Sequence, residues 1–144
     1  MMRAIDKSSL YERDYHRWAL EQAAKLRRGD PLDSENIAEE LESLGRSQEQ
    51  QLINRLVILI AHRLKWDWQP SGRSNSWRAT IREQQKRIVR LIEKNPSLQS
   101  LITEAIPEAH DIAITLASHE TGIVEEDFPQ ECPYSFDELM REIQ

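Results

Sequence analysis

The chain has few cysteines, glycines and prolines and no long apolar run. Its 144 residues include one cysteine, Cys132, which excludes an internal disulfide framework and a cysteine-based zinc ribbon. The longest apolar run, LVILIA at 56–61, is far shorter than the roughly 20 residues of a membrane-spanning helix. The first residues also lack the apolar segment of a signal peptide. These absences predict a cytoplasmic protein that has no membrane contact.

With only four glycines and six prolines, the chain is rich in helix formers. Ser9 and Glu12 have the spacing of a capping box, so a first helix is expected to begin there and to run to about Arg28, where Gly29 ends it. A second, long helix is expected over residues 34–68, because no proline interrupts that stretch.

Three further helical segments are expected after residue 70. A basic amphipathic helix should cover 76–94, and a fourth segment should break or kink at Pro107, since an interior proline costs about 3 kcal/mol. A capping box at Ser135 begins a short last helix. The predicted fold class is all-α: an antiparallel helical bundle of four to five main helices with a kinked fourth segment and a short C-terminal helix. We expect it to form a single domain over residues 1–144.

Charge is distributed unevenly along the chain. Residues 1–50 carry 8 basic and 11 acidic side chains, residues 51–94 carry 10 and 3, and residues 95–144 carry 1 and 11. The preferred interpretation is that the basic middle helix packs against the acidic last third. The alternative is that the basic segment is a surface for phosphates.

The middle segment combines the two residue types that bind nucleic acids, basic side chains for phosphates and aromatic rings for bases. The candidate nucleic-acid-binding residues are Lys65, Arg73, Arg78, Arg82 and Arg87. Interleaved with them are Trp66, Trp68 and Trp77. The competing interpretation is that the indoles belong to the core, and the net charge of −6 opposes non-specific binding to nucleic acid.

One pair of residues has the spacing of a catalytic motif. Arg55 and His62 are seven residues apart on one helix face, about 10.5 Å along its axis. An arginine followed by such a histidine resembles the ribonuclease motif of the HEPN superfamily, which are small helical bundles that act on RNA. That motif usually has a polar residue after the arginine, whereas Leu56 begins an apolar run here. The alternative is a hydrogen-bonded structural histidine.

Other catalytic and metal-binding signatures are absent from the sequence. It has no glycine-rich phosphate loop, no G-x-S-x-G elbow and no Glu-x-x-His step. His110 and His119 are nine residues apart and would lie on opposite sides of a helix, so they cannot share one ion. Cys132 lies in an acidic loop that should raise its thiol pKa and make it a poor nucleophile. We therefore expect no metal and no cofactor.

Several segments together resemble a known family. They are LYERDYHRWALEQAAKLR, NIAEELESLGRS, HRLKWDWQPSGRSNSWRATIREQQKRI, NPSL and FPQECPYSFDEL. Their order and spacing are similar to those of the bacterial family called domain of unknown function 29, abundant in cyanobacteria, over roughly residues 9–141. The resemblance implies an all-helical fold and no established activity. Positions that match the family include Trp18, Glu39, Glu40, Glu42, Gly45, His62, Lys65, Trp66, Gln69, Pro70, Ser76 and Trp77.

The sequence therefore favours a non-enzymatic protein-interaction or self-associating module, acting through an unidentified protein partner or as a homo-oligomer. The alternative is a nucleic-acid-binding or HEPN-like ribonuclease module that uses the basic 63–90 region. In either case we expect three large side chains to point inward, those of His62, Trp66 and Trp77. The side chains expected to face solvent are those of Lys65, Arg73 and Arg78.

Overall fold

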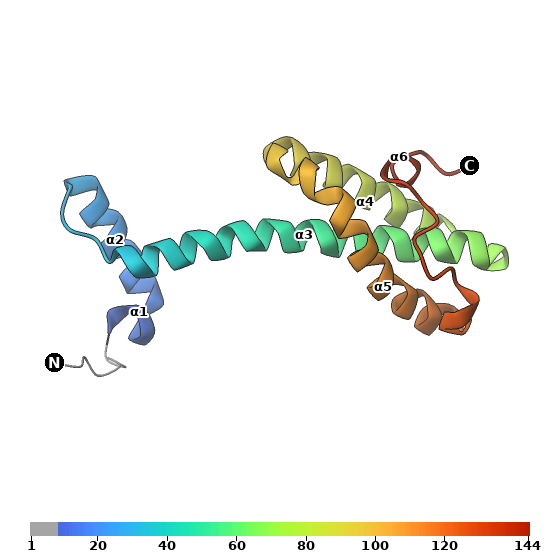
Figure 1. Ribbon diagram of the computed structural model, residues 1–144, viewed down its shortest axis with the longest axis horizontal. Helices are drawn as coiled ribbons and strands as arrows, with labels where there is room; N and C mark the ends of the chain where they lie inside the picture. The colour runs from blue at the N-terminus through green and yellow to red at the C-terminus, as the bar shows by residue number, and fades with distance from the viewer. Residues whose placement is uncertain (1–8) are drawn as a thin grey trace. The chain divides into compact units, whose positions relative to one another are not determined.

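The computed structural model describes residues 9–144, and the regular structure within this range is entirely helical (Figure 1). The α-helices are α1 (Leu10–Arg13), α2 (Tyr15–Arg28), α3 (Ser34–Trp68), α4 (Asn75–Lys94), α5 (Ile102–Thr121) and α6 (Phe136–Leu139). Short 3-10 helices cover Pro70–Gly72, Pro96–Leu101 and Glu125–Asp127. The all-α fold class is confirmed. None of the described helices is both long enough and apolar enough to cross a bilayer.

The described chain divides into two compact units, an N-terminal unit that ends at Gly45 and a C-terminal unit over Arg46–Gln144. Helix α3 contributes its first twelve residues to the one unit and the remainder to the other. The single domain over residues 1–144 stays a prediction.

The first predicted helix is in fact two helices. α1 stops at Arg13, and Asp14 leaves helical geometry with φ −151°. The Asp14 carboxylate then caps α2 by accepting a hydrogen bond of 3.0 Å from the backbone N–H of Arg17. The side chain of Ser9 makes no capping hydrogen bond, so the predicted capping box was wrong. Gly29 ends α2 as predicted, at a positive φ of 76° that glycine adopts without strain.

Aromatic side chains join the helices of the N-terminal unit. The rings of Tyr11, Tyr15 and Trp18 form a cluster, with 4.6 Å between the centroids of Tyr11 and Trp18. The Trp18 indole N–H donates to the Asp33 carboxylate at 2.9 Å, just before α3 begins. Both tyrosine hydroxyls donate to the carboxylate of Glu40, and this hydrogen bond raises the pKa of Tyr11 to about 12. Hydrogen bonds donated by aromatic side chains therefore connect α1 and α2 to the first part of α3.

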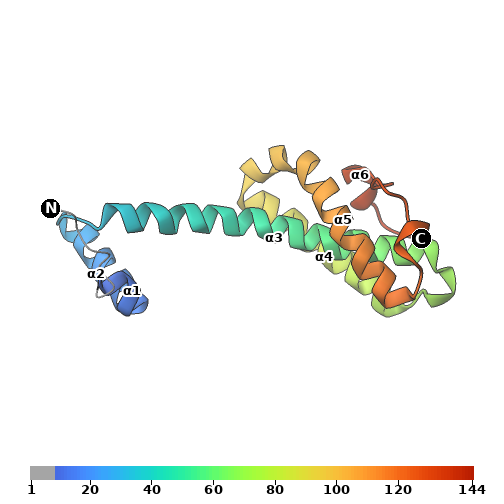
Figure 2. The same cartoon turned by 60° about the horizontal axis from the view of Figure 1, so that its bottom comes forward.

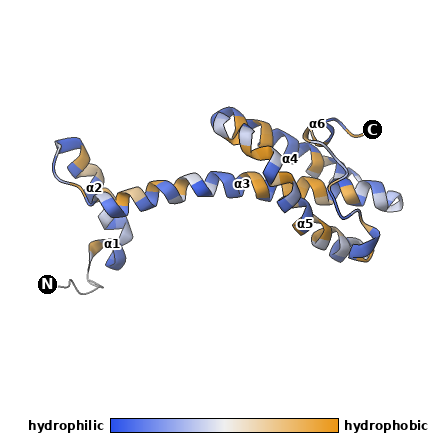
Figure 3. Ribbon diagram, viewed as in Figure 1, coloured by the Kyte–Doolittle hydropathy of each residue, from blue (hydrophilic) through white to orange (hydrophobic). Residues whose placement is uncertain are grey.

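The C-terminal unit has an apolar core centred on the second half of α3. Figure 3 shows this half as the most continuous apolar stretch of the helix. Figures 1 and 2 both place α4 and α5 along it. The side chains of Leu56, Leu59, Ile60 and Leu64 are fully buried. On α5 the buried residues include alanines every four positions, which let that helix approach closely: Ala105, Ala109, Ala113 and Ala117.

The fourth predicted segment consists of two helical pieces, but their junction is not at Pro107. The 3-10 helix Pro96–Leu101 passes into α5 at Ile102, and α5 then continues through Pro107 to Thr121. Proline removes only the bond to the carbonyl four residues earlier, that of Thr103. Because Thr103 lies in the first turn of α5, the later hydrogen bonds of the helix are unaffected.

Candidate functional site

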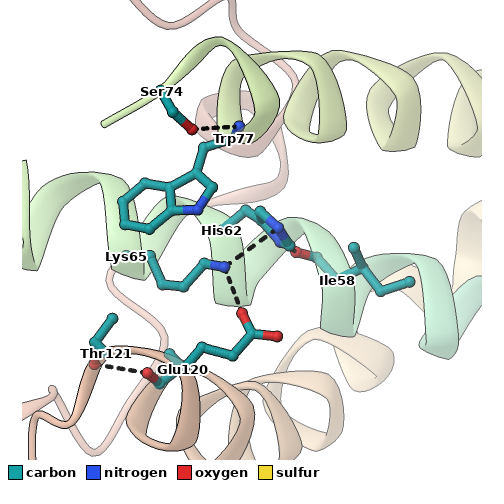
Figure 4. Close-up of polar contacts among 8 residues, drawn as sticks. Ile58, His62, Lys65, Ser74, Trp77, Glu120 and Thr121 are labelled. Atoms are coloured by element: carbon teal, nitrogen blue, oxygen red, sulfur yellow. Dashed lines mark hydrogen bonds and ion pairs between the residues drawn. The ribbon is translucent and has the colours of Figure 1, made fainter. Parts of the chain in front are cut away.

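Of the two residues in the catalytic hypothesis, His62 lies where three helices of the C-terminal unit meet (Figure 4). Arg55 is partly buried on α3, about two turns before His62. His62 and Lys65 are in the last two turns of α3, Trp77 is in the first turn of α4, and Glu120 is in the last turn of α5. Figure 4 shows the Lys65 ammonium between the His62 imidazole and the Glu120 carboxylate, beside the Trp77 indole.

Both ring nitrogens of His62 have partners within the unit. Nδ1 lies 2.8 Å from the carbonyl oxygen of Ile58, and because a carbonyl can only accept, the ring proton is on Nδ1. Nε2 then holds the lone pair and accepts from Nζ of Lys65 at 3.4 Å. Burial lowers the pKa of His62 below its ordinary value, which favours this neutral form. The arrangement supports a structural histidine, and the ribonuclease role of Arg55 and His62 stays a hypothesis.

Lys65 does not face solvent, and that prediction was wrong. The residue is only 4% exposed, and its ammonium forms an ion pair with Glu120. Nζ also lies 4.8 Å from the centroid of the Trp77 ring, in a cation–π contact. A buried ammonium is stable only where such partners replace its water. Lys65 is therefore not available to an external phosphate.

The turn between α3 and α4 fixes the position of Trp77. The Ser74 hydroxyl accepts a hydrogen bond of 3.1 Å from the Trp77 backbone N–H and so caps α4. A Cβ at Gly72 would come within 2.7 Å of the Trp77 ring and 2.8 Å of the Gln69 amide oxygen, so only glycine fits there. Trp77 is partly buried and Trp66 is 6% exposed, in agreement with their predicted inward orientation.

Arg73 and Arg78 are exposed but have partners within the unit. Both guanidinium groups lie over the Trp66 ring, at 4.8 Å and 4.9 Å from its centroid. Nε of Arg73 donates to the Trp66 carbonyl at 2.8 Å. Nη1 of Arg78 donates to the carbonyl of Ile143 at 3.1 Å. These contacts hold the end of α3 and the C-terminal segment against α4.

Other side chains of the basic segment also hold the C-terminal residues. Arg82 pairs with Glu142 at 3.0 Å, and Nη1 of Arg63 donates to the Glu138 carbonyl at 2.8 Å. The buried amide of Gln85 donates to the carbonyls of both Leu139 and Arg141, at 2.8 Å and 2.7 Å. These bonds place the basic middle segment against the last third of the chain, as the first interpretation of the charge pattern expected, but among the described residues only Arg82–Glu142 and Lys65–Glu120 pair opposite charges between them.

The last of the candidate nucleic-acid-binding residues, Arg87, pairs with Glu83 one turn earlier on α4 at 3.0 Å. All five candidates thus have partners inside the unit. Sequence reasoning missed Gln85, because a glutamine among basic residues looks like a solvent-facing position. Its two acceptors are backbone carbonyls, which have no sequence signature.

Residues considered for metal or nucleophilic chemistry are separated in the structure. Within residues 9–144, no group of three or more His, Cys, Asp and Glu side chains could hold an ion. His110 is 1% exposed and His119 is exposed. Burial raises the pKa of the Cys132 thiol, the direction expected from sequence, although burial has a larger effect than the neighbouring acid Glu138.

The described fold is all-helical, and His62 and the five candidate nucleic-acid-binding residues have partners inside the C-terminal unit. The chain belongs to the family described as domain of unknown function DUF29, because the model of that family matches residues 10–143. The family resemblance seen in the sequence is confirmed. Neither a curated protein nor a solved structure matches the chain.

Proposed function

We propose that this protein is a non-enzymatic, self-associating module whose N-terminal unit pairs with the same unit of a second copy. The observation that supports this proposal is a set of leucines that remain exposed on α2 and on the first part of α3. Leu26 is 66% exposed, Leu41 63% and Leu44 60%. Leucines are normally covered when they continue the buried face of an amphipathic helix.

Leu26 and Leu44 continue the faces through which α2 and α3 already contact each other, and Leu41 lies beside Leu44, about 60° from it on the helix circumference. At 100° per residue, Leu26 lies about 80° from Trp18 on the helix circumference, and Leu44 lies about 40° from Glu40. Trp18 and Glu40 make contacts within the unit. Leu26 and Leu44 extend the same faces by about two turns and one turn. Within α2, only Trp18 and Gln22 are buried. A second copy would cover the remainder of each face.

The charges of the two helices favour a second copy over another occupant. α2 carries four basic side chains and one acidic one, whereas residues 34–45 of α3 carry four glutamates and no basic residue. A two-fold interface brings one surface against itself, so α2 of each copy can lie along α3 of the other. In that arrangement the basic residues of α2 face the acidic residues of α3 in both of the symmetry-related contacts. The small size of the unit also favours pairing, because small folds seldom bury enough surface alone.

The first test is the molar mass of the full chain at increasing concentration, measured by light scattering after size exclusion. We expect a dimer that the double variant Leu41→Lys, Leu44→Lys dissociates. The matched control is Val89→Lys with Ile112→Lys, which places the same charges on exposed apolar positions of the C-terminal unit. Circular dichroism checks that each variant is helical. A wild-type chain that stays monomeric at every concentration would overturn the proposal.

A charge-exchange experiment separates pairing of identical chains from binding to another protein. One variant reverses the net charge of α2 (Lys25→Glu, Arg27→Glu), and a second reverses that of residues 34–45 of α3 (Glu35→Lys, Glu39→Lys, Glu42→Lys). Each variant alone should be monomeric, because like charges then face each other. An equimolar mixture should form a heterodimer, since both contacts become complementary again. If mixing restores nothing while both variants lose a protein captured from lysate, the occupant is a different protein and self-association is wrong.

The nucleic-acid alternative has weaker support, because its five candidate residues are engaged within the C-terminal unit. It predicts salt-sensitive binding of RNA or DNA that is lost when Arg82 and Arg87 are reversed in charge. Absence of binding at low salt would exclude it. Its ribonuclease form further predicts RNA cleavage that His62→Ala abolishes without loss of the fold.

A further inference from the structure

The C-terminal unit contains a cavity of about 540 Å³ between the start of α5 and the loop that leads to α6. Its wall is mainly apolar and includes Ile102, Ile106, Tyr134 and Phe136. Small-molecule sites in proteins have volumes of about 300–1,000 Å³ and are apolar with a few polar groups. The cavity has the size and the lining of such a site.

His110 supplies an unusual polar group to this wall. It is 1% exposed, and its Nε2 lies 2.8 Å from the carbonyl oxygen of Pro129, so the ring proton is on Nε2. Nδ1 therefore holds a lone pair, and this buried atom has no hydrogen-bond partner within the protein. Buried acceptors without a partner are rare in native proteins, and each one calls for an explanation. A ligand with a donor group provides the missing partner.

The charges around the cavity restrict the ligand further. The wall contains the acidic residue Glu131 and no lysine or arginine. A carboxylate or phosphate would therefore find no cationic side chain in the wall. Arg63 lies behind the wall, 4.7 Å from the centroid of the Tyr134 ring, and already donates to the Glu138 carbonyl. Anionic ligands are accordingly disfavoured.

We propose that this cavity binds a small, neutral, largely apolar molecule whose hydroxyl or N–H group donates a hydrogen bond to Nδ1 of His110. Nδ1 is covered from solvent in the present conformation, so the donor reaches it when residues 130–134 shift while the Pro129 carbonyl keeps its bond to Nε2. That segment contains no α-helix and can adjust without breaking a helical hydrogen-bond ladder.

Three probes of similar size test the proposal on the full chain: phenol, toluene and benzoate. Isothermal titration should show saturable binding of phenol, at least roughly fivefold weaker binding of toluene, the equivalent of one net hydrogen bond, and no binding of benzoate. His110→Phe keeps a planar ring but removes the acceptor, so it should abolish the preference for phenol over toluene. Equal affinity of the wild type for phenol and toluene, or no binding of either, would overturn the proposal.

A pair of variants on α5 locates the binding site. Ile106→Trp places a larger side chain in the cavity and should abolish binding of phenol. Ile112→Trp makes the same change at an exposed position of the same helix and should leave binding unchanged. Nuclear Overhauser effects from phenol to the methyl groups of Ile106, measured on the wild-type chain, do not depend on the folding of any variant. Their absence at saturating phenol would contradict the assigned site.

Discussion

The two units of this protein use similar amphipathic sequences in different ways. In the C-terminal unit most apolar side chains of the long helices are covered, and Leu56 and Leu59 are fully buried, although Val89 and Ile112 are exposed. In the N-terminal unit the helices meet through hydrogen bonds from Tyr11, Tyr15 and Trp18 to carboxylates, and leucines on the same faces are exposed. An apolar stripe thus predicts a helix, but it does not predict whether the same chain covers that stripe.

The difference has an energetic consequence. Full burial of a leucine or isoleucine contributes about 1.5–3 kcal/mol, whereas one internal hydrogen bond contributes a net of about 1 kcal/mol. The N-terminal unit has few buried apolar side chains and depends on hydrogen bonds. We therefore expect it to open locally at a lower free energy than the C-terminal unit. Four predictions test this contrast.

The largest effect should come from a cavity in the core. Leu59→Ala removes a fully buried side chain and should lower the free energy of unfolding by about 2–5 kcal/mol. Leu20→Ala truncates a side chain that is 61% exposed in the N-terminal unit and should change it by less than about 0.5 kcal/mol. Guanidinium denaturation followed by circular dichroism measures both. Equal losses would contradict the contrast between the units.

The buried ion pair should contribute more than an exposed one. Lys65→Met keeps the apolar stem but removes the ammonium between Glu120 and His62, and should cost about 1–2 kcal/mol. The cost stays moderate because the Glu120 side chain is 37% exposed and can be hydrated. Arg87→Met breaks the exposed pair with Glu83 and should cost less than about 0.5 kcal/mol. Denaturation curves that rank the two variants in the opposite order would exclude a stabilising role for Lys65.

Loss of one indole hydrogen bond should affect only the N-terminal unit. Trp18→Phe removes the bond to Asp33 and should lower the local opening free energy of residues 15–40 by about 1 kcal/mol. Hydrogen exchange of backbone amides measures this, and the amides of α4 and α5 should be unchanged. Trp68→Phe is the control, since that ring is 37% exposed. Faster exchange throughout the C-terminal unit would show that the effect is not local.

The smallest effect should be a pH dependence from His62. Its pKa is lowered in the folded state by burial, so the unfolded chain binds this proton more readily. The contribution of neutral His62 to stability should be fully present above pH 6.5, its ordinary pKa. It should be lost as the pH falls from there through the lower pKa of the folded state. His62→Gln should flatten the melting temperature over this window, whereas His119→Gln should not. An unchanged slope in His62→Gln would exclude this residue as the source.

Local sequence signals predicted most of the helices correctly. The absence of proline correctly indicated one helix from Ser34 to Trp68, and the capping box at Ser135 begins α6 as predicted. Ser9 does precede a helix, but its side chain makes no capping hydrogen bond, and α1 ends at Asp14, which caps α2. The spacing of a capping box therefore located the start of a helix but not its capping hydrogen bonds.

The site was harder to predict, because its decisive contacts join distant residues. Lys65 is buried through a glutamate 55 positions away, and no local pattern reveals that distance. Gln85 and Arg63 bind backbone carbonyls of the C-terminal segment, and every residue has a carbonyl. At His110, the proton is on Nε2 because the carbonyl of Pro129, 19 residues later, accepts it, and Nδ1 is left without a partner. No local pattern in the sequence reveals this contact.

The continuity of α3 bears on the order in which the protein folds. Starting a helix is costly because the first turn fixes several residues for a single hydrogen bond, whereas each added residue gains a bond of its own. The buried second half of α3 can form that first turn as the core condenses, and the helix can then lengthen towards Ser34 without a new nucleus. A chain cut at Gly45 would lose this template, and we expect its acidic segment 34–45 to be largely unfolded alone.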